Sequence, residues 1–222
     1  PDIQYVVVEA KGSKWILGAE CLEKYSEDFD GHVVLGFVRG SDLVGRAYKP
    51  LFDYFEDRKD AFRVLEADFV DTSEGTGVVH MAPGFGEDDQ IICELNGIEI
   101  GDAVPVDEKG RFTTDVGDWT GENVFEANPH IIQHLKDRNR ILRHDTYEHN
   151  YPHCWRTDTP IIYRAISSWY VEVTKIRSRL QDINQEINWV PDHVRDGRFG
   201  QWLAGARDWS ISRNRFWGSP LP

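Results

Sequence analysis

The segment that decides the fold spans residues 75–89 and reads G-T-G-V-V-H-M-A-P-G-F-G-E-D-D. Its part Val78–Met81 is short and β-branched, which predicts a strand that carries His80 to the end of a sheet. Residues 83–86 predict a turn, because glycine adopts backbone conformations closed to other residues and lets the chain approach a ligand closely. The three acids that follow predict the start of a helix over 90–95, closed by Asn96 and Gly97, since negative charge is favourable at a helix N-terminus.

His80 and Asp89 are the candidate functional side chains of this segment. Nine positions separate them, enough for a strand end, a turn and a helix start to converge on one pocket. Such a pocket would offer a carboxylate to an ammonium group, with an imidazole beside it. A structural interpretation stays open, because acids in a first helical turn commonly stabilise the helix itself and a histidine at a strand end is commonly a structural residue.

Outward from this segment, strands dominate the first third of the chain and mixed elements follow. Further strands are predicted over residues 3–9, 14–17, 32–38, 61–70, 141–146, 160–165, 169–174 and 210–212. Helices are predicted over 129–138 with Asn128 as N-cap, along the apolar positions of 176–187, and over 199–206. Residues 40–45 read as a turn. This order lacks a strand–helix–strand rhythm and indicates a β-rich α+β fold.

Composition narrows the class of protein. The chain has 222 residues, 40% of them apolar, which indicates one large or two small folded domains and excludes a disordered chain. No apolar run approaches the roughly 18 residues that a membrane span needs, so no membrane partner is expected. Cys21, Cys93 and Cys154 are odd in number and widely spaced, which suits a reducing compartment and predicts a cytoplasmic location. The first residue is Pro1, which indicates a fragment or a processed chain.

Charge is divided unevenly along the chain. Residues 1–130 hold 28 acidic and 11 basic residues, a balance of −17, whereas residues 131–222 hold 10 and 14, a balance of +4. Two differently solvated faces would explain this division. A second interpretation is that a polyanion can approach only the second half. Binding of duplex DNA by the whole chain is not expected, because that requires a basic footprint.

Several standard catalytic and metal-binding patterns are absent. The chain has no G-x-S-x-G nucleophile elbow, no P-loop, no G-x-G-x-x-G and no C-x-x-C. His149 and His153 are four residues apart and adjoin Cys154, but Pro152 would break a helix between them. Structural zinc needs four good ligands, so we predict a surface loop here and no metal site.

Residues 75–89 and four further stretches together resemble the editing domain inserted in the catalytic core of isoleucyl-tRNA synthetases. The other stretches are Y-K-P-L-F (48–52), Y-P-H-C-W-R-T-D-T-P-I-I-Y-R (151–164), S-W-Y-V (168–171) and D-W-S-I-S-R-N-R-F-W-G-S-P (208–220). The resemblance extends over essentially the whole chain. It implies an editing domain over residues 1–207, a distorted β-barrel-like structure with peripheral helices. Residues 208–222 would then be a strand returning toward the nucleotide-binding core.

The resemblance implies an aminoacyl-tRNA ester hydrolase that removes valine from isoleucine tRNA. A bound water would attack the ester, no cofactor would be needed, and the rest of the synthetase would act in cis. ATP and Mg would serve the synthetic site, outside this chain, so no ligase activity is expected of it alone. Asp89 would pair with the substrate's α-ammonium, and His80 would line the side-chain pocket and exclude isoleucine. The implied substrate-binding residues are Gly75, Thr76, Gly77, Val79, His80, Pro83, Gly84, Phe85, Asp88 and Asp89.

Two other functions stay open, and the sequence differs from the family's pattern at two points. The chain could be a non-catalytic module that positions tRNA, or a valyl-type editing domain that hydrolyses Thr-tRNA. The family's Thr-rich segment is expected just upstream of Pro1 and is missing. Some relatives carry a C-x-x-C metal pair at Cys154, but Thr157 stands at its second position, so no zinc is expected.

Overall fold

The structure, a computed structural model, describes residues 2–58, 60–101 and 103–213. It divides the chain into two compact units, Pro1–Ala165 and Ile166–Pro222. The boundary predicted between residues 207 and 208 falls within the second unit, and as a division of function it stays a prediction. Residues 214–222, which include the end of the predicted return strand, lie outside the described residues.

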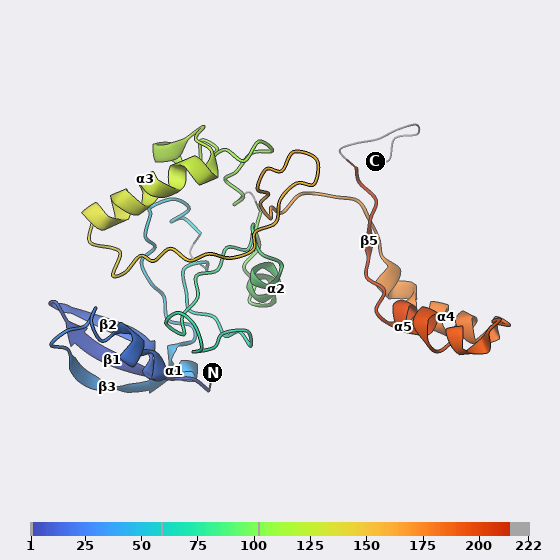
Figure 1. The fold of residues 1–222 in the computed structure, drawn as a ribbon, viewed down its shortest axis with the longest axis horizontal. Coiled ribbons are helices and arrows are strands. Elements are labelled where there is room, and N and C mark those ends of the chain that lie inside the picture. The colour runs from blue at the N-terminus through green and yellow to red at the C-terminus, as the bar shows by residue number, and fades with distance from the viewer. Residues whose placement is uncertain (1, 59, 102, 214–222) are drawn as a thin grey trace. The chain divides into compact units, whose positions relative to one another are not determined.

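The first unit opens with a three-stranded antiparallel sheet in the order β2-β1-β3 (Figure 1). Its strands are β1 (Gln4–Ala10), β2 (Ser13–Gly18) and β3 (Val33–Arg39), which confirms the strands predicted over 3–9, 14–17 and 32–38. Lys11 and Gly12 both have positive φ, at 53° and 75°. Two such residues form the tight turn whose twist matches a hairpin, so they fix the register of β1 on β2.

One face of this sheet forms the main core. Val6 on β1 pairs with Leu17 on β2, and both are almost fully buried. The cluster consists of Val6, Val8, Ala10, Leu17, Cys21 and Phe29. Burying a side chain of this size stabilises the fold by about 1.5–3 kcal/mol.

The described residues of the first unit form three α-helices: α1 (Gly40–Leu43), α2 (Glu87–Leu95) and α3 (Val124–Asp137). Helix α2 confirms the helix predicted after the three acids and begins at the first of them. It ends at Asn96, and Gly97 follows with a φ of +74°, the left-handed conformation that closes many helices. Helix α1 lies where the sequence predicted only a turn. Short 3-10 helices cover Ala19–Cys21, Glu23–Tyr25 and Gly117–Trp119.

The predicted start of α3 was wrong. The Asn123 side chain, rather than Asn128, caps the helix and accepts a hydrogen bond from the Phe125 N–H at 3.0 Å. Pro129 lies inside the helix and not at its first position. Ala127 is fully buried with Val116 and Trp119 in a second apolar cluster, and this tertiary contact holds the turn that precedes the proline.

Four predicted strands do not form. Residues 61–70 make only an isolated bridge between Ala47 and Arg63, and the 160–165 stretch makes one between His153 and Pro160. Residues 78–81 and 141–146 are extended without being strands. Alternating apolar residues predict a strand only where a partner strand continues the ladder of hydrogen bonds. Residues 62–64 exchange backbone hydrogen bonds with residues 45–48, but among the described residues this pairing does not extend into a strand.

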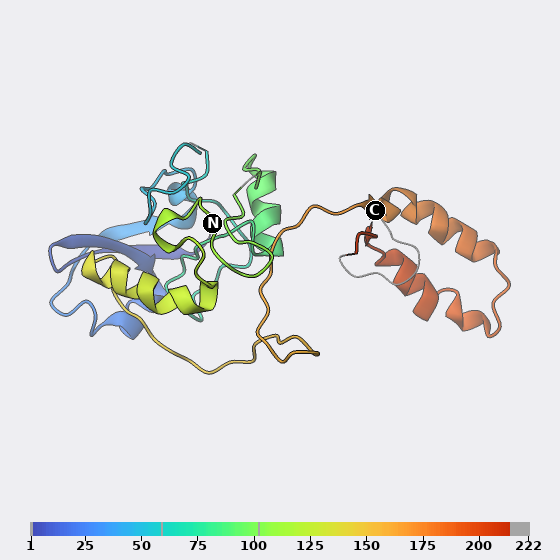
Figure 2. The same ribbon diagram turned by 90° about the horizontal axis from the view of Figure 1, so that it is seen from above.

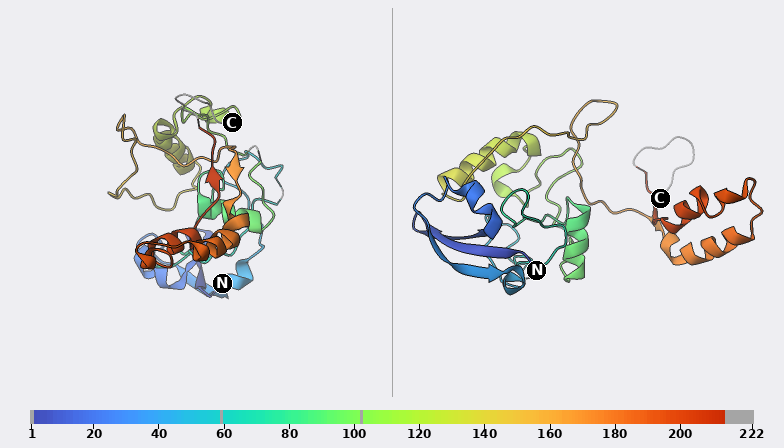
Figure 3. Two further views of the ribbon diagram at one scale, coloured as in Figure 1. Left: turned by 90° about the vertical axis from the view of Figure 1, so that its right-hand side faces the viewer. Right: turned by 60° about the horizontal axis from the view of Figure 1, so that its bottom comes forward.

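The second unit is a helical hairpin joined to a short ribbon (Figure 3). Its elements are β4 (Tyr170–Val171), α4 (Val173–Glu186), a 3-10 helix (Asp192–Val194), α5 (Arg198–Ala204) and β5 (Trp209–Ser210). The predictions of 176–187 and 199–206 as helical are confirmed, and the predicted strands shrink to two residues each. Asn184 is buried between the helices, where its amide donates to the Arg195 carbonyl at 2.8 Å and accepts from the Trp189 ring N–H.

The fold is therefore mixed α/β, and the predicted β-rich, barrel-like structure was wrong. The described residues form one three-stranded and one two-stranded sheet, neither of which closes, and their helices contain more residues than their strands. Among the same residues, no helix is both long and apolar enough to cross a membrane.

A tight turn after residue 153 gives Cys154 an unusual environment. The Cys154 N–H donates to the Thr159 carbonyl at 2.8 Å, and the Asp158 N–H donates back to the Cys154 carbonyl at 2.8 Å. The Thr157 hydroxyl and the backbone N–H groups of Arg156 and Thr157 donate toward the sulfur, and they lower the pKa of the Cys154 thiol to about 7. Burial instead raises the thiol pKa values of Cys21 and Cys93.

Shortening a side chain in the main core should make the chain easier to unfold. We expect Val8→Ala to lower the free energy of unfolding by about 2–3 kcal/mol, because Val8 is fully buried and the cavity cannot refill. Val33→Ala, on the exposed side of β3, should change it by no more than about 0.5 kcal/mol. Urea unfolding measures both, and equal losses would contradict this description of the core.

Alkylation should separate the three cysteines by pH. The thiolate is the reactive form, so its fraction rises as pH passes the pKa. Iodoacetamide should therefore modify Cys154 with a midpoint near pH 7, while Cys21 and Cys93 stay protected in the folded chain. Thr157→Val removes the largest stabilising contact and should shift the midpoint upward. An unchanged midpoint in that variant would show that Thr157 does not set the pKa.

Candidate functional site

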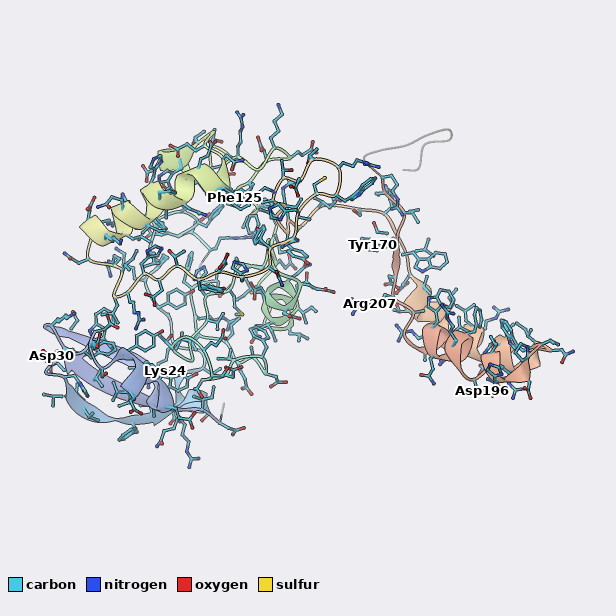
Figure 4. The ribbon with its side chains drawn as sticks, in the orientation of Figure 1. Lys24, Asp30, Phe125, Tyr170, Asp196 and Arg207 are labelled. Atoms are coloured by element: carbon cyan, nitrogen blue, oxygen red, sulfur yellow. The ribbon has the colours of Figure 1, made fainter. Side chains whose placement is uncertain are left out.

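The predicted site begins at a turn that is fastened to the sheet. The Tyr5 hydroxyl donates to the Gly77 carbonyl at 2.7 Å, and the Gly18 N–H donates to the Thr76 carbonyl at 2.7 Å. Gly75 and Gly77 have φ values of +64° and +72°, which only glycine adopts readily. Lys24 adds hydrogen bonds from its ammonium to the carbonyls of residues 72 and 73 (Figure 4). Residues 75–77 thus leave the edge of the sheet in a fixed direction.

Residues 78–81 then run outward in extended form. The Val79 side chain is 54% exposed, and His80 is also exposed. No strand carries His80, so the predicted route that delivers it to a sheet end was wrong. Its role as a pocket wall stays a prediction.

Asp89 is the third residue of α2, and its side chain closes the loop before the helix. Its Oδ2 accepts a hydrogen bond from the Ala82 N–H at 2.9 Å, and the Phe85 N–H donates to the Ala82 carbonyl at 2.8 Å. A Cβ added at Gly86 would lie 2.9 Å from the same Oδ2, so glycine is required for the carboxylate to sit there. Asp89 is half-buried, whereas Asp88 in the same turn is exposed. The structure therefore distinguishes the two acids.

A shallow groove of about 150 Å³ lies beside this loop. Its lining consists of Pro83, Gly84, Phe85, Gly86, Glu87, Gln90, Tyr163, Arg164 and Ala165. The Ala165 N–H donates to the Gly84 carbonyl at 2.8 Å, which holds the two segments together. The Arg164 guanidinium donates to the Val106 carbonyl at 2.7 Å, so this cation is held in place.

The groove contains only part of the predicted site. Pro83, Gly84 and Phe85 line it, whereas Gly75, Thr76, Gly77, Val79, His80, Asp88 and Asp89 do not. Sequence reasoning missed the contribution of residues 163–165. They stand in one of the stretches that carried the family resemblance, but nothing in their spacing placed them against Gly84.

Negative charge surrounds the first turns of α2. Glu87, Asp88 and Asp89 occupy the first turn of the helix. Burial raises the pKa of the Cys93 thiol one turn further on, and the charges of Asp89 and Glu94 raise it further. This end of the helix therefore favours a positively charged ligand group over an anion.

The chain's residues do not form a metal centre within its described part. There, no three His, Cys, Asp or Glu side chains lie close enough together to hold an ion. His149 and His153 instead contact neighbouring backbone carbonyls through Nδ1, at 3.1 and 2.8 Å.

Comparison with known proteins gives the family. Residues 13–222 match the family model described as tRNA synthetases class I (I, L, M and V). The chain is 52% identical to proteins named isoleucine–tRNA ligase from Rickettsia akari (strain Hartford), Rickettsia canadensis (strain McKiel) and Rickettsia bellii (strain OSU 85-389). Each alignment covers 100% of this chain and 20% of the relative, so the chain spans a fifth of the relatives' length.

These findings overturn the function inferred from the sequence. The matched region is the class I synthetase region itself, and it includes all of the stretches that suggested an inserted editing domain. Those stretches are therefore marks of the synthetase family. The interpretation as an editing domain that hydrolyses Val-tRNA, or Thr-tRNA in the valyl form, was therefore wrong. With nearly the whole chain matched by one family model, this chain belongs to the class I tRNA synthetases of the isoleucine, leucine, methionine and valine group.

Proposed function

We propose that this chain works within an isoleucine–tRNA ligase and binds the amino-acid-bearing end of one of its substrates. The observation that carries the proposal is the 52% identity to isoleucine–tRNA ligases along the whole chain. Because the chain spans a fifth of those relatives, ligation and the use of isoleucine tRNA belong to the full-length protein. A cytoplasmic location stays a prediction from the cysteine content.

ATP and Mg, which the family implies for the full-length enzyme, do not fit the residues present here. The sequence has no P-loop, and the described part of the chain offers no cluster of three metal-ligating side chains. The groove beside α2 is bordered by acids, which disfavours a triphosphate. We therefore place ATP and Mg outside this chain.

Asp89 is the residue best suited to hold an α-ammonium group. One of its oxygens is fixed by the Ala82 N–H, which orients the carboxylate without neutralising its charge. In the described residues, the other oxygen receives no hydrogen bond. A half-buried carboxylate of fixed orientation binds an ammonium more strongly than a mobile surface acid, since less ordering is needed and less water screens the pair.

The neighbouring loop supplies the remaining contacts in this proposal. Pro83, Gly84 and Phe85 form one wall of the groove, and Tyr163 and Arg164 form the other. Gly75–Gly77, with Val79 and His80, lead to this loop from the sheet, and we propose that His80 and Val79 complete the apolar side on which an amino-acid side chain rests. Asp88, exposed on α2, contributes charge to the approach.

The full-length protein should attach isoleucine to tRNA in preference to valine. Valine lacks one methylene, whose burial is worth about 0.8 kcal/mol, so isoleucine should be favoured by at least about fourfold in kcat/KM. Aminoacylation of isoleucine tRNA with each amino acid measures this ratio, with leucine as a second competitor. A preference for valine or leucine would refute the assignment to isoleucine.

Removing the charge of Asp89 should weaken the binding of an aminoacyl group that carries an ammonium. Asp89→Asn keeps an oxygen for the Ala82 N–H but loses the partner of the ammonium. We expect about tenfold weaker binding of an amide-linked aminoacyl-adenosine to the full-length protein, measured with its activation site filled by an adenylate analogue.

Two controls make this experiment specific. The analogue without its amino group should bind Asp89→Asn and the wild type equally, because it has no charge to lose. Asp88→Asn should bind the analogue without its amino group as the wild type does, and it should lose less affinity for the charged analogue than Asp89→Asn, because Asp88 is exposed and its charge is screened by water. A loss of affinity for both compounds in Asp89→Asn would mean that Asp89 only supports the loop.

A further inference from the structure

Four aromatic side chains form a ladder along an extended segment of the first unit. They are Tyr147, His149, Tyr151 and His153, here called the aromatic ladder. The rings of the first two are stacked with centroids 4.9 Å apart, and the next two pairs follow edge-to-face at 5.9 and 6.1 Å. Successive side chains of an extended chain point to opposite sides, so residues at every second position share one side. Figure 2 shows this segment continuing from α3 without a helix or strand.

One ring of the aromatic ladder packs against helix α3, and the ladder residues are exposed to solvent. Phe125, on the first turn of α3, meets the Tyr151 ring edge-to-face at 6.1 Å (Figure 4). All four ladder residues are exposed, and Tyr147 reaches 75%. Aromatic rings of this size normally bury most of their surface. Rings that are already ordered by one another, yet open to solvent, provide a preformed stacking surface.

The two histidines also present a polar edge. A carbonyl oxygen only accepts hydrogen bonds, so Nδ1 of His149 and His153 must carry the proton that reaches the backbone carbonyls of residues 150 and 151. Nε2 is then left to bind a ligand. Glu148 alternates with the ladder and therefore points to its other side.

Charge around the ladder fits a polyanion. Residues 131–165 hold six basic and four acidic residues, a balance of +2, against −17 for residues 1–130. Arg143 is paired with Asp145 at 2.6 Å, which offsets the charge of the acid that precedes the ladder. Beyond its end, the Arg156 guanidinium lies 4.3 Å from the centre of the exposed Trp155 ring.

We propose that the aromatic ladder stacks the unpaired nucleotides at the 3′ end of the tRNA. Every base has a flat face, so a row of aromatic rings binds single-stranded nucleic acid without reading its sequence. The ladder precedes Tyr163–Ala165, which line the groove beside Gly84, by about ten residues. A tRNA whose amino acid entered that groove would bring its last nucleotides to this segment. The inference rests on the proposed function, because it takes tRNA as the substrate.

The experiment compares two forms of isoleucine tRNA, intact and shortened by its unpaired 3′ nucleotides. Binding of each to the full-length protein is measured at one fixed salt concentration. The variant Tyr147→Leu/His149→Leu removes two stacking rings. Tyr147→Phe/His149→Phe keeps rings at both positions, and Phe69→Leu removes a ring that is exposed elsewhere in the first unit.

The wild type should bind intact tRNA at least about tenfold more tightly than shortened tRNA, as stacking of one base provides. The leucine pair should lose this difference while binding shortened tRNA as before. The phenylalanine pair and Phe69→Leu should keep it. Retention of the difference in the leucine pair, or an equal loss for both tRNAs, would overturn the proposal and point to a protein partner or a structural role. If the wild type binds neither tRNA, the proposed function fails with it.

Discussion

The attachment of residues 75–77 to the sheet is the constraint on which the candidate site depends. Two hydrogen bonds, from the Tyr5 hydroxyl to Gly77 and from the Gly18 N–H to Thr76, join segments that are about sixty to seventy residues apart. Gly77 permits this course of the chain because its φ of +72° lies in the left-handed region that favours glycine. Tyr5 and Gly18 belong to strands that also supply residues of the main core, so the buried sheet sets the direction of the site loop.

The Asp89 carboxylate has a structural role, and the proposed function gives it a second one. As the third residue of α2 it benefits from the helix N-terminus, and its bond to the Ala82 N–H fixes the loop over residues 82–86. The sequence left open that these acids stabilise the helix itself, and this interpretation is correct for Asp89. It does not exclude that Asp89 also binds a ligand. Asp88 and Asp89 are equivalent in the sequence pattern, and only the loop geometry separates them.

The helices and strands that were predicted well are those whose formation depends on residues close together in the sequence. The strands near residues 4 and 13 are joined by a tight turn and have buried residues, and α2 has acids at its start and Asn-Gly at its end. The errors occurred where distant contacts decide. Apolar residues alternate along 61–70 as in a strand, but no partner strand lies beside them in the described residues. Helix α3 is capped by Asn123 because Ala127 is buried against Trp119. Likewise, the pairing of Gly84 with Ala165 leaves no local pattern, so half of the groove could not be predicted.

Charge and structure divide the chain at different places, and this difference bears on the proposed binding of tRNA. The change of sign near residue 130 lies inside the first unit, whose boundary is at Ala165. That unit therefore combines a strongly acidic part, which attracts the ammonium of an amino acid and repels phosphates, with a weakly basic segment over 131–165. Under the proposed function, a tRNA would approach this unit along the basic segment. The acids in the first turn of α2 would then keep phosphates away from Asp89 and leave its carboxylate to an amino group.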